Sequence, residues 1–168
     1  YRALVTERRR PAARAATPGQ HAAPLYAVWE VTMHCDQPCA HCGSRAGSPR
    51  SVELDTEQAL AVADALGEMG CREIALIGGE AYLRRDLTQI IARLASHGIR
   101  VGMQTGGRSV TPAMLEKLRA AGLTQLGVSV DGFAEVHDEL RGNVGSHAAT
   151  VRAMAAAKEV GLAISANS

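Results

Sequence analysis

Three cysteines close together offer the most reactive chemistry in this chain. Cys35, Cys39 and Cys42 fall within eight residues, separated by three and then two others. In a reducing compartment, such clustering is typical of metal or redox chemistry rather than of a disulfide framework. Three thiolates on one short loop can converge on a soft centre such as an iron–sulfur cluster, because Pro38 and Gly43 let the backbone curl around it.

No fourth cysteine lies near these three. Cys71 opens a later apolar run, at the expected opposite end of the sheet, and we expect it to be a buried apolar thiol. A cluster held by three thiolates keeps one position open for a substrate or cofactor. Structural zinc is the alternative, with His34 or His41 completing a Cys₃His set. Zinc ribbons usually bring their ligands as two separated pairs, and the sequence has no second pair, so we favour the cluster.

A repeating order of apolar runs, glycine-containing loops and capped helices must position this loop. Strands are expected at residues 27–32, 73–77, 100–105, 126–130 and 162–166. Two pairs, Asp55 with Gln58 and Asp86 with Gln89, indicate capping boxes at helix starts, and Thr111 precedes a proline as an N-cap would. Glycines that can end helices in a left-handed conformation follow at Gly70, Gly98, Gly122 and Gly161.

Strands that alternate with helices predict an α/β fold with a parallel sheet and right-handed crossovers. The chain has 168 residues, whereas a complete eight-stranded α/β barrel needs about 250. An open doubly wound sheet and part of a barrel both fit the pattern, and periodicity alone leaves the two open. In either fold, ligands bind at the carboxyl ends of the strands.

Composition narrows the classes of function. Hydrophobic residues make up 46% of the chain, and 18 basic side chains stand against 17 acidic ones, so we expect a soluble globular protein with no nucleic-acid partner. The sequence contains neither a long apolar run nor a secretory pattern, which favours a cytoplasmic protein without a membrane span. We expect residues 1–24 to form an unpacked leader and residues 25–168 to form one core domain. The start at Tyr1 suggests part of a longer chain.

Two motifs together resemble one enzyme family. The spacing Cys35-x₃-Cys39-x₂-Cys42 after the first strand is similar to that of radical S-adenosylmethionine (radical SAM) enzymes, and Gly78-Gly79-Glu80 at the end of the second strand is similar to their Gly-Gly-Glu motif. The resemblance implies a [4Fe–4S] cluster on the three cysteines. It also implies S-adenosylmethionine bound through its amino group at the Gly-Gly-Glu motif, and a partial (β/α)₆ TIM-type barrel truncated after about strand five.

Further residues are implied by the same resemblance. Arg141 is similar to an arginine that pairs with the cofactor carboxylate, the alternative being a surface ion pair with Asp138 or Glu139. His41 stands where an aromatic residue often packs against the adenine, and its alternative is a solvent-facing loop residue.

Strand ends supply the remaining candidates. Thr105 closes the third strand where relatives commonly show Thr-Asn-Gly, and Ser129 with Asp131 resembles a Ser-x-Asp-Gly motif that contacts the ribose. Asp131 before a glycine is otherwise simple turn chemistry. Asn167 either faces the adenosine or merely ends the fifth strand.

The resemblance implies reductive cleavage of S-adenosylmethionine to a 5′-deoxyadenosyl radical, with electrons from an external donor of the flavodoxin or ferredoxin type. It is closest to the SPASM/twitch branch, which modifies ribosomal peptides or proteins, so we expect such a substrate. Two alternatives stay open. One is an enzyme of small-molecule or cofactor biosynthesis, and the other is a non-catalytic iron–sulfur binding or electron-transfer module.

Overall fold

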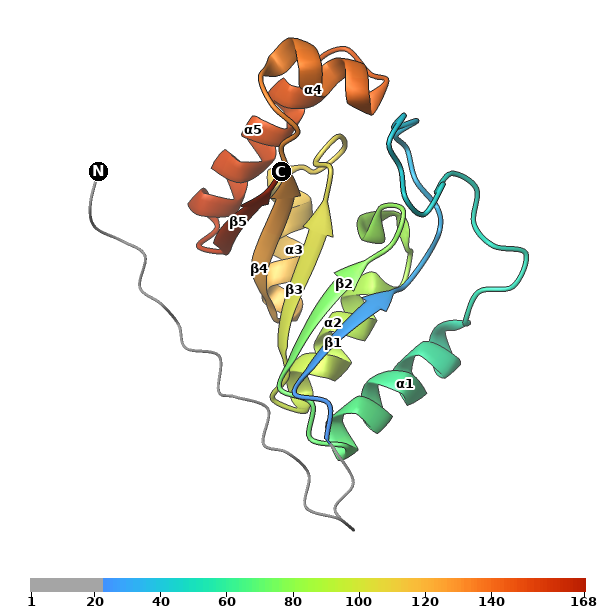
Figure 1. Ribbon diagram of the computed structural model, residues 1–168. Coiled ribbons are helices and arrows are strands. Elements are labelled where there is room, and N and C mark those ends of the chain that lie inside the picture. Colours follow the sequence, from blue (N-terminus) through green and yellow to red (C-terminus); the bar gives the residue numbers. More distant parts are fainter. Residues whose placement is uncertain (1–22) are drawn as a thin grey trace.

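The computed structural model describes residues 23–168, in which strands and helices alternate along the chain (Figure 1). The strands are β1 (Tyr26–Glu30), β2 (Glu73–Ile77), β3 (Arg100–Thr105), β4 (Leu123–Ser129) and β5 (Ala163–Asn167). The helices are α1 (Thr56–Glu68), the 3₁₀ turn η1 (Ala81–Leu83), α2 (Leu87–Ser96), α3 (Pro112–Ala121), α4 (Ala134–Arg141) and α5 (Ser146–Glu159).

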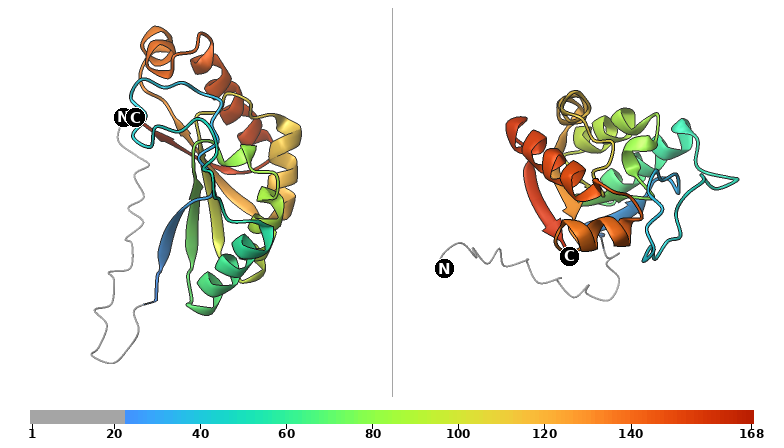
Figure 2. Two further views of the ribbon diagram at one scale, coloured as in Figure 1. Left: turned by 90° about the vertical axis from the view of Figure 1, so that its right-hand side faces the viewer. Right: turned by 90° about the horizontal axis from the view of Figure 1, so that it is seen from above.

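The sheet order decides between the two architectures that the sequence leaves open. All neighbouring strands are parallel, and they follow one another in the order β1-β2-β3-β4-β5. A doubly wound sheet reverses its strand order at a switch point, whereas a barrel winds in one direction. Figure 2 shows the result: the sheet curves, and α1, α2, α3 and α5 cover only its outer face. The fold is therefore barrel-type.

The hydrophobic core fills the space between the sheet and these outer helices. Leu76, Met103 and Leu126 point outward from three adjacent strands and are fully buried. They pack in one cluster with Ile90 of α2 and Leu115 of α3. Because successive strand residues face opposite sides, the same alternation places polar residues on the inner, concave face.

That concave face carries a ladder of neutral polar side chains. Gln125 of β4 donates a hydrogen bond to Ser165 Oγ of β5 at 3.0 Å, and Asn167 donates to Gln104 Oε1 of β3 at 2.9 Å. Figure 2 shows no helix over this side of the sheet in the part of the chain that the structure describes.

Most helix boundaries follow the sequence signals. The Asp55 and Gln58 capping box at the start of α1 is confirmed, as is the Thr111 N-cap of α3. The prediction of a capping box at Asp86 is wrong: its carboxylate makes no cap bond and accepts hydrogen bonds from the Arg84 guanidinium at 2.7 and 3.0 Å. The four predicted glycines, Gly70, Gly98, Gly122 and Gly161, all have positive φ.

The fourth strand begins earlier than expected, at Leu123 rather than at residue 126. Gly122 ends α3 in a left-handed conformation, so the chain enters the sheet at once. The polar residues Thr124 and Gln125 hide this start in the sequence. In the structure Thr124 donates a hydrogen bond to Val101 O at 2.9 Å, and Gln125 faces the polar concave side.

The crossover between β4 and β5 holds two helices, α4 and α5. Asp138 on α4 accepts hydrogen bonds from the backbone N–H groups of Gly145 at 2.6 Å and His147 at 2.8 Å, which lowers the pKa of its carboxyl group. These bonds fix the angle between the helices and hold the end of α4 over the carboxyl edge of the sheet (Figure 1).

Thr150 ties α5 to the loop after β3, and its replacement provides a test of the fold. Its buried Oγ1 lies 2.7 Å from Gly106 O and donates to it. We expect Thr150→Val to lower the free energy of unfolding by about 1–3 kcal/mol, because the carbonyl group loses this donor. Urea denaturation measures the effect, with Thr150→Ser, which keeps the hydroxyl, as the control. Equal midpoints for the two variants would contradict the prediction.

Of the leader expected over residues 1–24, residues 1–22 lie outside the described part of the chain. Within residues 23–168, no helix has both the length and the apolar character needed to cross a membrane. The predicted domain limits at residue 24 therefore stay a prediction.

Candidate functional site

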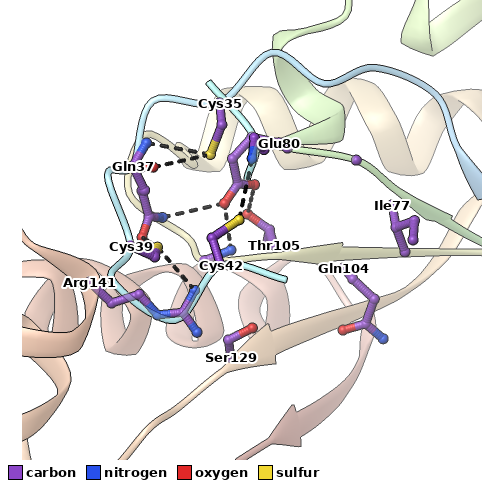
Figure 3. Close-up of a pocket in the computed structure, with 14 residues that line it drawn as sticks. Cys35, Gln37, Cys39, Cys42, Ile77, Glu80, Gln104, Thr105, Ser129 and Arg141 are labelled. Atoms are coloured by element: carbon purple, nitrogen blue, oxygen red, sulfur yellow. Dashed lines mark hydrogen bonds between the residues drawn. The ribbon is translucent and has the colours of Figure 1, made fainter. Parts of the chain in front are cut away.

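A cavity of about 190 Å³ opens at the carboxyl ends of β2, β3 and β4 (Figure 3). Its walls come from the loops after β1, β2 and β3, from the last residues of β2, β3 and β4, and from the end of α4. The lining residues are Cys35, Gln37, Cys39, Cys42, Ala46, Ile77, Gly78, Gly79, Glu80, Gln104, Thr105, Gly106, Ser129 and Arg141. Most candidate residues from the sequence thus meet in one place; the exceptions are His34, His41, Asp131 and Asn167.

The three cysteines lie on a loop, residues 34–47, that we call the cysteine loop. It is closed at its base where Cys35 N donates a hydrogen bond to Gly47 O at 2.9 Å. Farther along, Ala40 N donates to Leu140 O, at the end of α4, at 2.8 Å. All three thiols are free and partly exposed, and all face the shared cavity.

The Gly-Gly-Glu motif needs its two glycines because the chain that enters the cysteine loop passes very close to them. Gly79 N donates a hydrogen bond to Thr32 O at 2.9 Å, and Glu80 N donates to His34 O at 2.7 Å. A Cβ at Gly79 would overlap His34 O and lie 2.7 Å from Cys35 Cβ, and one at Gly78 would overlap Thr32 O. Only glycine lets the two loops approach this closely.

Glu80 is the most perturbed acid at the cavity. The residue is 3% exposed, and burial raises the pKa of its carboxyl group to about 7. Hydrogen bonds from Thr105 Oγ1 at 2.6 Å and from Gly106 N at 2.7 Å oppose that rise. A buried carboxylate held at such a cost is typical of a functional group that awaits a cationic partner.

Gln37 is a site residue that the sequence did not reveal. Its side chain is buried between the cysteines and the acid: Nε2 donates to Glu80 Oε1 at 3.3 Å, and Oε1 accepts from Cys39 Sγ at 3.8 Å. A Cβ at Gly106 would overlap this amide, so the loop after β3 also depends on it. Its place between two cysteines was the only available signal.

Arg141 reaches the cavity from the end of α4. Its Nε donates to Asp131 Oδ2 at 2.5 Å, and its Nη1 lies 3.7 Å from Cys39 Sγ. The ion pair with Asp138 or Glu139 that the sequence left as an alternative is replaced by this pair with Asp131. Asp131 therefore orients Arg141 and does not itself line the cavity.

Neither histidine considered for zinc lines the cavity of the three thiols. His34 is exposed and lines a different cavity, of about 540 Å³. His41 has partners for both ring nitrogens, with Nδ1 3.3 Å from Leu140 O and Nε2 3.6 Å from Asp131 Oδ2. Within residues 23–168, no three thiol, imidazole or carboxylate groups lie close enough to hold one ion. Neither histidine is therefore placed to complete a Cys₃His set with these thiols.

Two residues flank the cavity as the strand-end motifs suggested. Thr105 Oγ1 is buried against Glu80, and Ser129 lines the wall beside Arg141. Asn167 lies outside the lining and binds Gln104, which does line it. Cys71 is buried before β2, where its thiol donates to Glu73 O at 3.4 Å, as expected of an apolar thiol.

Comparison with known families decides what this arrangement is. The sequence model described as the radical SAM superfamily matches residues 29–167. The chain belongs to the radical SAM superfamily. Enzymes of this superfamily use a [4Fe–4S] cluster and S-adenosylmethionine, and the donor set of the cavity fits both groups: three thiols on one side and a buried carboxylate on the other.

Two curated radical SAM relatives are similar over most of this chain. The AdoMet-dependent heme synthase of Methanosarcina barkeri is 39% identical over 131 residues, which are 77% of this chain and 38% of that protein. The mycofactocin maturase MftC of Mycolicibacterium smegmatis is 35% identical over 133 residues, which are 79% of this chain and 34% of that protein. The chain thus spans little more than a third of the length of these relatives.

Solved radical SAM structures confirm the fold. The crystal structure of Streptococcus suis SuiB bound to precursor peptide SuiA matches with a TM-score of 0.74 and 18% sequence identity, over 86% of this chain and 33% of that one. At this identity the likeness concerns the fold alone. It confirms the partial TIM-type barrel expected from the sequence.

Proposed function

We propose that this chain carries the cofactor-binding part of a radical SAM enzyme, with Cys35, Cys39 and Cys42 as the ligands of a [4Fe–4S] cluster. When bound, the cluster and S-adenosylmethionine supply reductive cleavage of the carbon–sulfur bond to give methionine and a 5′-deoxyadenosyl radical. The observation that carries the proposal is the single cavity lined by the three thiols and Glu80. An external flavodoxin- or ferredoxin-type protein would supply the electron.

The chain's own residues would divide the recognition of the cofactor. Glu80 accepts the ammonium group, because a buried carboxylate gains most from a cationic partner. Arg141, oriented by Asp131, donates to the cofactor carboxylate. Thr105 and Gly106 fix the Glu80 carboxylate through their hydrogen bonds, so its position is set before any ligand arrives.

Residues farther along the wall would contact the rest of the cofactor. Ser129 faces the cavity and is assigned to the ribose. His41 and Asp131 lie outside the cavity lining, and Asp131 pairs with both His41 and Arg141, so we assign the two residues to support rather than to contact with adenine or ribose. Gly78 and Gly79 have no side chains, which lets the chain entering the cysteine loop pass close to this wall of the cavity.

For the substrate, we propose a ribosomal peptide or protein. The similarity to mycofactocin maturase MftC supports this. So does the concave face, where the amide and hydroxyl groups of Gln104, Gln125 and Ser165 match the hydrogen-bonding needs of a peptide backbone. A tetrapyrrole is the second candidate, favoured by the 39% identity to the AdoMet-dependent heme synthase.

The assay uses the complete protein after anaerobic reconstitution with iron and sulfide. With dithionite and S-adenosylmethionine, we expect 5′-deoxyadenosine, measured by liquid chromatography and mass spectrometry. A reconstituted protein that binds iron and sulfide yet yields none would refute the enzyme and leave the non-catalytic module. Faster turnover with an iron tetrapyrrole but not with a panel of linear peptides would favour the tetrapyrrole.

A further inference from the structure

Asp36 stands at the centre of a hydrogen-bond network outside the lining of the cavity. Its carboxylate accepts from Tyr82 Oη at 2.8 and 2.9 Å and from Ser109 Oγ at 2.7 Å. The backbone N–H of Ser109 also donates to Tyr82 Oη at 3.4 Å, so each of the three residues is bonded to the other two. The backbone carbonyl of Asp36 accepts from the Arg108 guanidinium.

These partners come from three different strand ends. Asp36 follows β1, Tyr82 lies in η1 after β2, and Ser109 belongs to the loop after β3. The sequence separations, 46 residues to Tyr82 and 73 to Ser109, show that the barrel fold alone brings them together. One carboxylate thus ties the loop that carries the cysteines to its two neighbours.

The network is separate from the site that it adjoins. Neither Asp36 nor Tyr82 nor Ser109 is among the residues that line the cavity. Tyr82 is 9% exposed, and burial together with the nearby carboxylates raises the pKa of its phenol, so the hydroxyl keeps its proton and stays a donor. Substitutions here remove support from the loop without removing a group that faces a ligand.

We propose that Asp36 is a positioning residue for the iron–sulfur cluster: its bonds to Tyr82 and Ser109 hold the cysteine loop in the shape that the three thiolates need. The inference rests on the cluster proposed above. A loop that must order three ligands loses conformational entropy on binding, and bonds formed beforehand reduce that loss. Cys35 is adjacent to Asp36, so any relaxation there moves a ligand directly.

The test measures how fast the reconstituted complete protein loses iron to a ferrous chelator in the absence of S-adenosylmethionine. We expect Asp36→Ala, Tyr82→Phe and Ser109→Ala each to release iron faster, by about tenfold for the first two. Asp36→Asn keeps one acceptor oxygen and should restore part of the loss. Tyr26→Phe removes a hydroxyl from a half-exposed tyrosine on β1 and is the matched control, with a rate equal to that of the parent.

Thermal unfolding of the iron-free variants separates positioning from a general loss of stability. Faster iron release at an unchanged unfolding temperature supports the proposal, and release within about twofold of the parent for both Asp36→Ala and Tyr82→Phe overturns it. If those two variants have lowered unfolding temperatures, the iron-release rate of Ser109→Ala is judged by the same criterion, because Ser109 lies at the surface and its replacement should not affect folding.

A second readout needs no cluster. If the parent protein takes up no iron and sulfide, the proposed function fails, and hydrogen exchange on the iron-free protein tests the network alone. Tyr82→Phe should then speed exchange of the Gln37 and Ala40 amides relative to Tyr26→Phe. Equal exchange rates would overturn the positioning role, whatever the function of the site.

Discussion

Replacing Cys35, Cys39 or Cys42 by alanine is expected to abolish the iron–sulfur cluster. In the proposed site each supplies one of three thiolates, and the cavity walls hold no further thiol in the described chain, so only two thiolates would remain. Bound iron and sulfide should fall at least about tenfold, together with the visible absorbance of the reconstituted protein.

Cys71→Ala is the matched control for these three variants. Its thiol is buried near the amino end of β2 and contacts only the local backbone among the described hydrogen bonds. The variant should keep the full iron and sulfide content. Retention of the cluster in any one of the three loop variants, or its loss in Cys71→Ala, would contradict the ligand assignment.

The sequence predicts this site well where its signals are local. The cysteine spacing and the Gly-Gly-Glu motif each lie within a few residues, directly after apolar runs that form strands. Parallel strands bring their carboxyl ends to one edge, so Cys35, Glu80 and Thr105 had to meet once the fold class was known. The cavity lining confirms that meeting.

The sequence could not predict which side chains pair through the tertiary structure. Arg141 pairs with Asp131 rather than with its helix neighbours, because the turn after β4 brings that carboxylate under the guanidinium. Asp86 gives its carboxylate to Arg84 in place of a helix cap, and its backbone, at φ −97° and ψ 13°, lacks the extended conformation that a capping side chain needs. Both outcomes depend on tertiary geometry.

Glu80→Gln is expected to remove binding of S-adenosylmethionine while leaving the cluster in place. Glutamine fits the same space and can still bond to Thr105 and Gly106, but it carries no charge for the ammonium group. Loss of one partner of a buried charge pair costs about 2–5 kcal/mol, so affinity should fall at least about thirtyfold. Calorimetric titration of the reconstituted protein measures this, and unchanged affinity would contradict the assignment.

The same substitution should stabilise the protein without its ligands. Burial raises the pKa of Glu80 to about 7 from 4.5, so the folded state binds the proton more tightly than the unfolded state does. The resulting stability is fully present below the unfolded pKa and is lost as the pH rises through 7, by an amount on the order of 3 kcal/mol. Glu80→Gln removes this loss and should exceed the parent in unfolding free energy at about pH 8.

Glu116→Gln, on the exposed surface of α3, changes the same charge without burial and serves as the control for urea denaturation between about pH 5 and pH 8. The parent and this control should lose stability together as the pH rises, while Glu80→Gln should stay nearly constant. Identical pH dependence of the unfolding free energy in all three would show that ionised Glu80 does not destabilise the folded protein. A glutamine variant that folds better and binds worse would identify the buried carboxylate as a group kept for its ligand rather than for the fold.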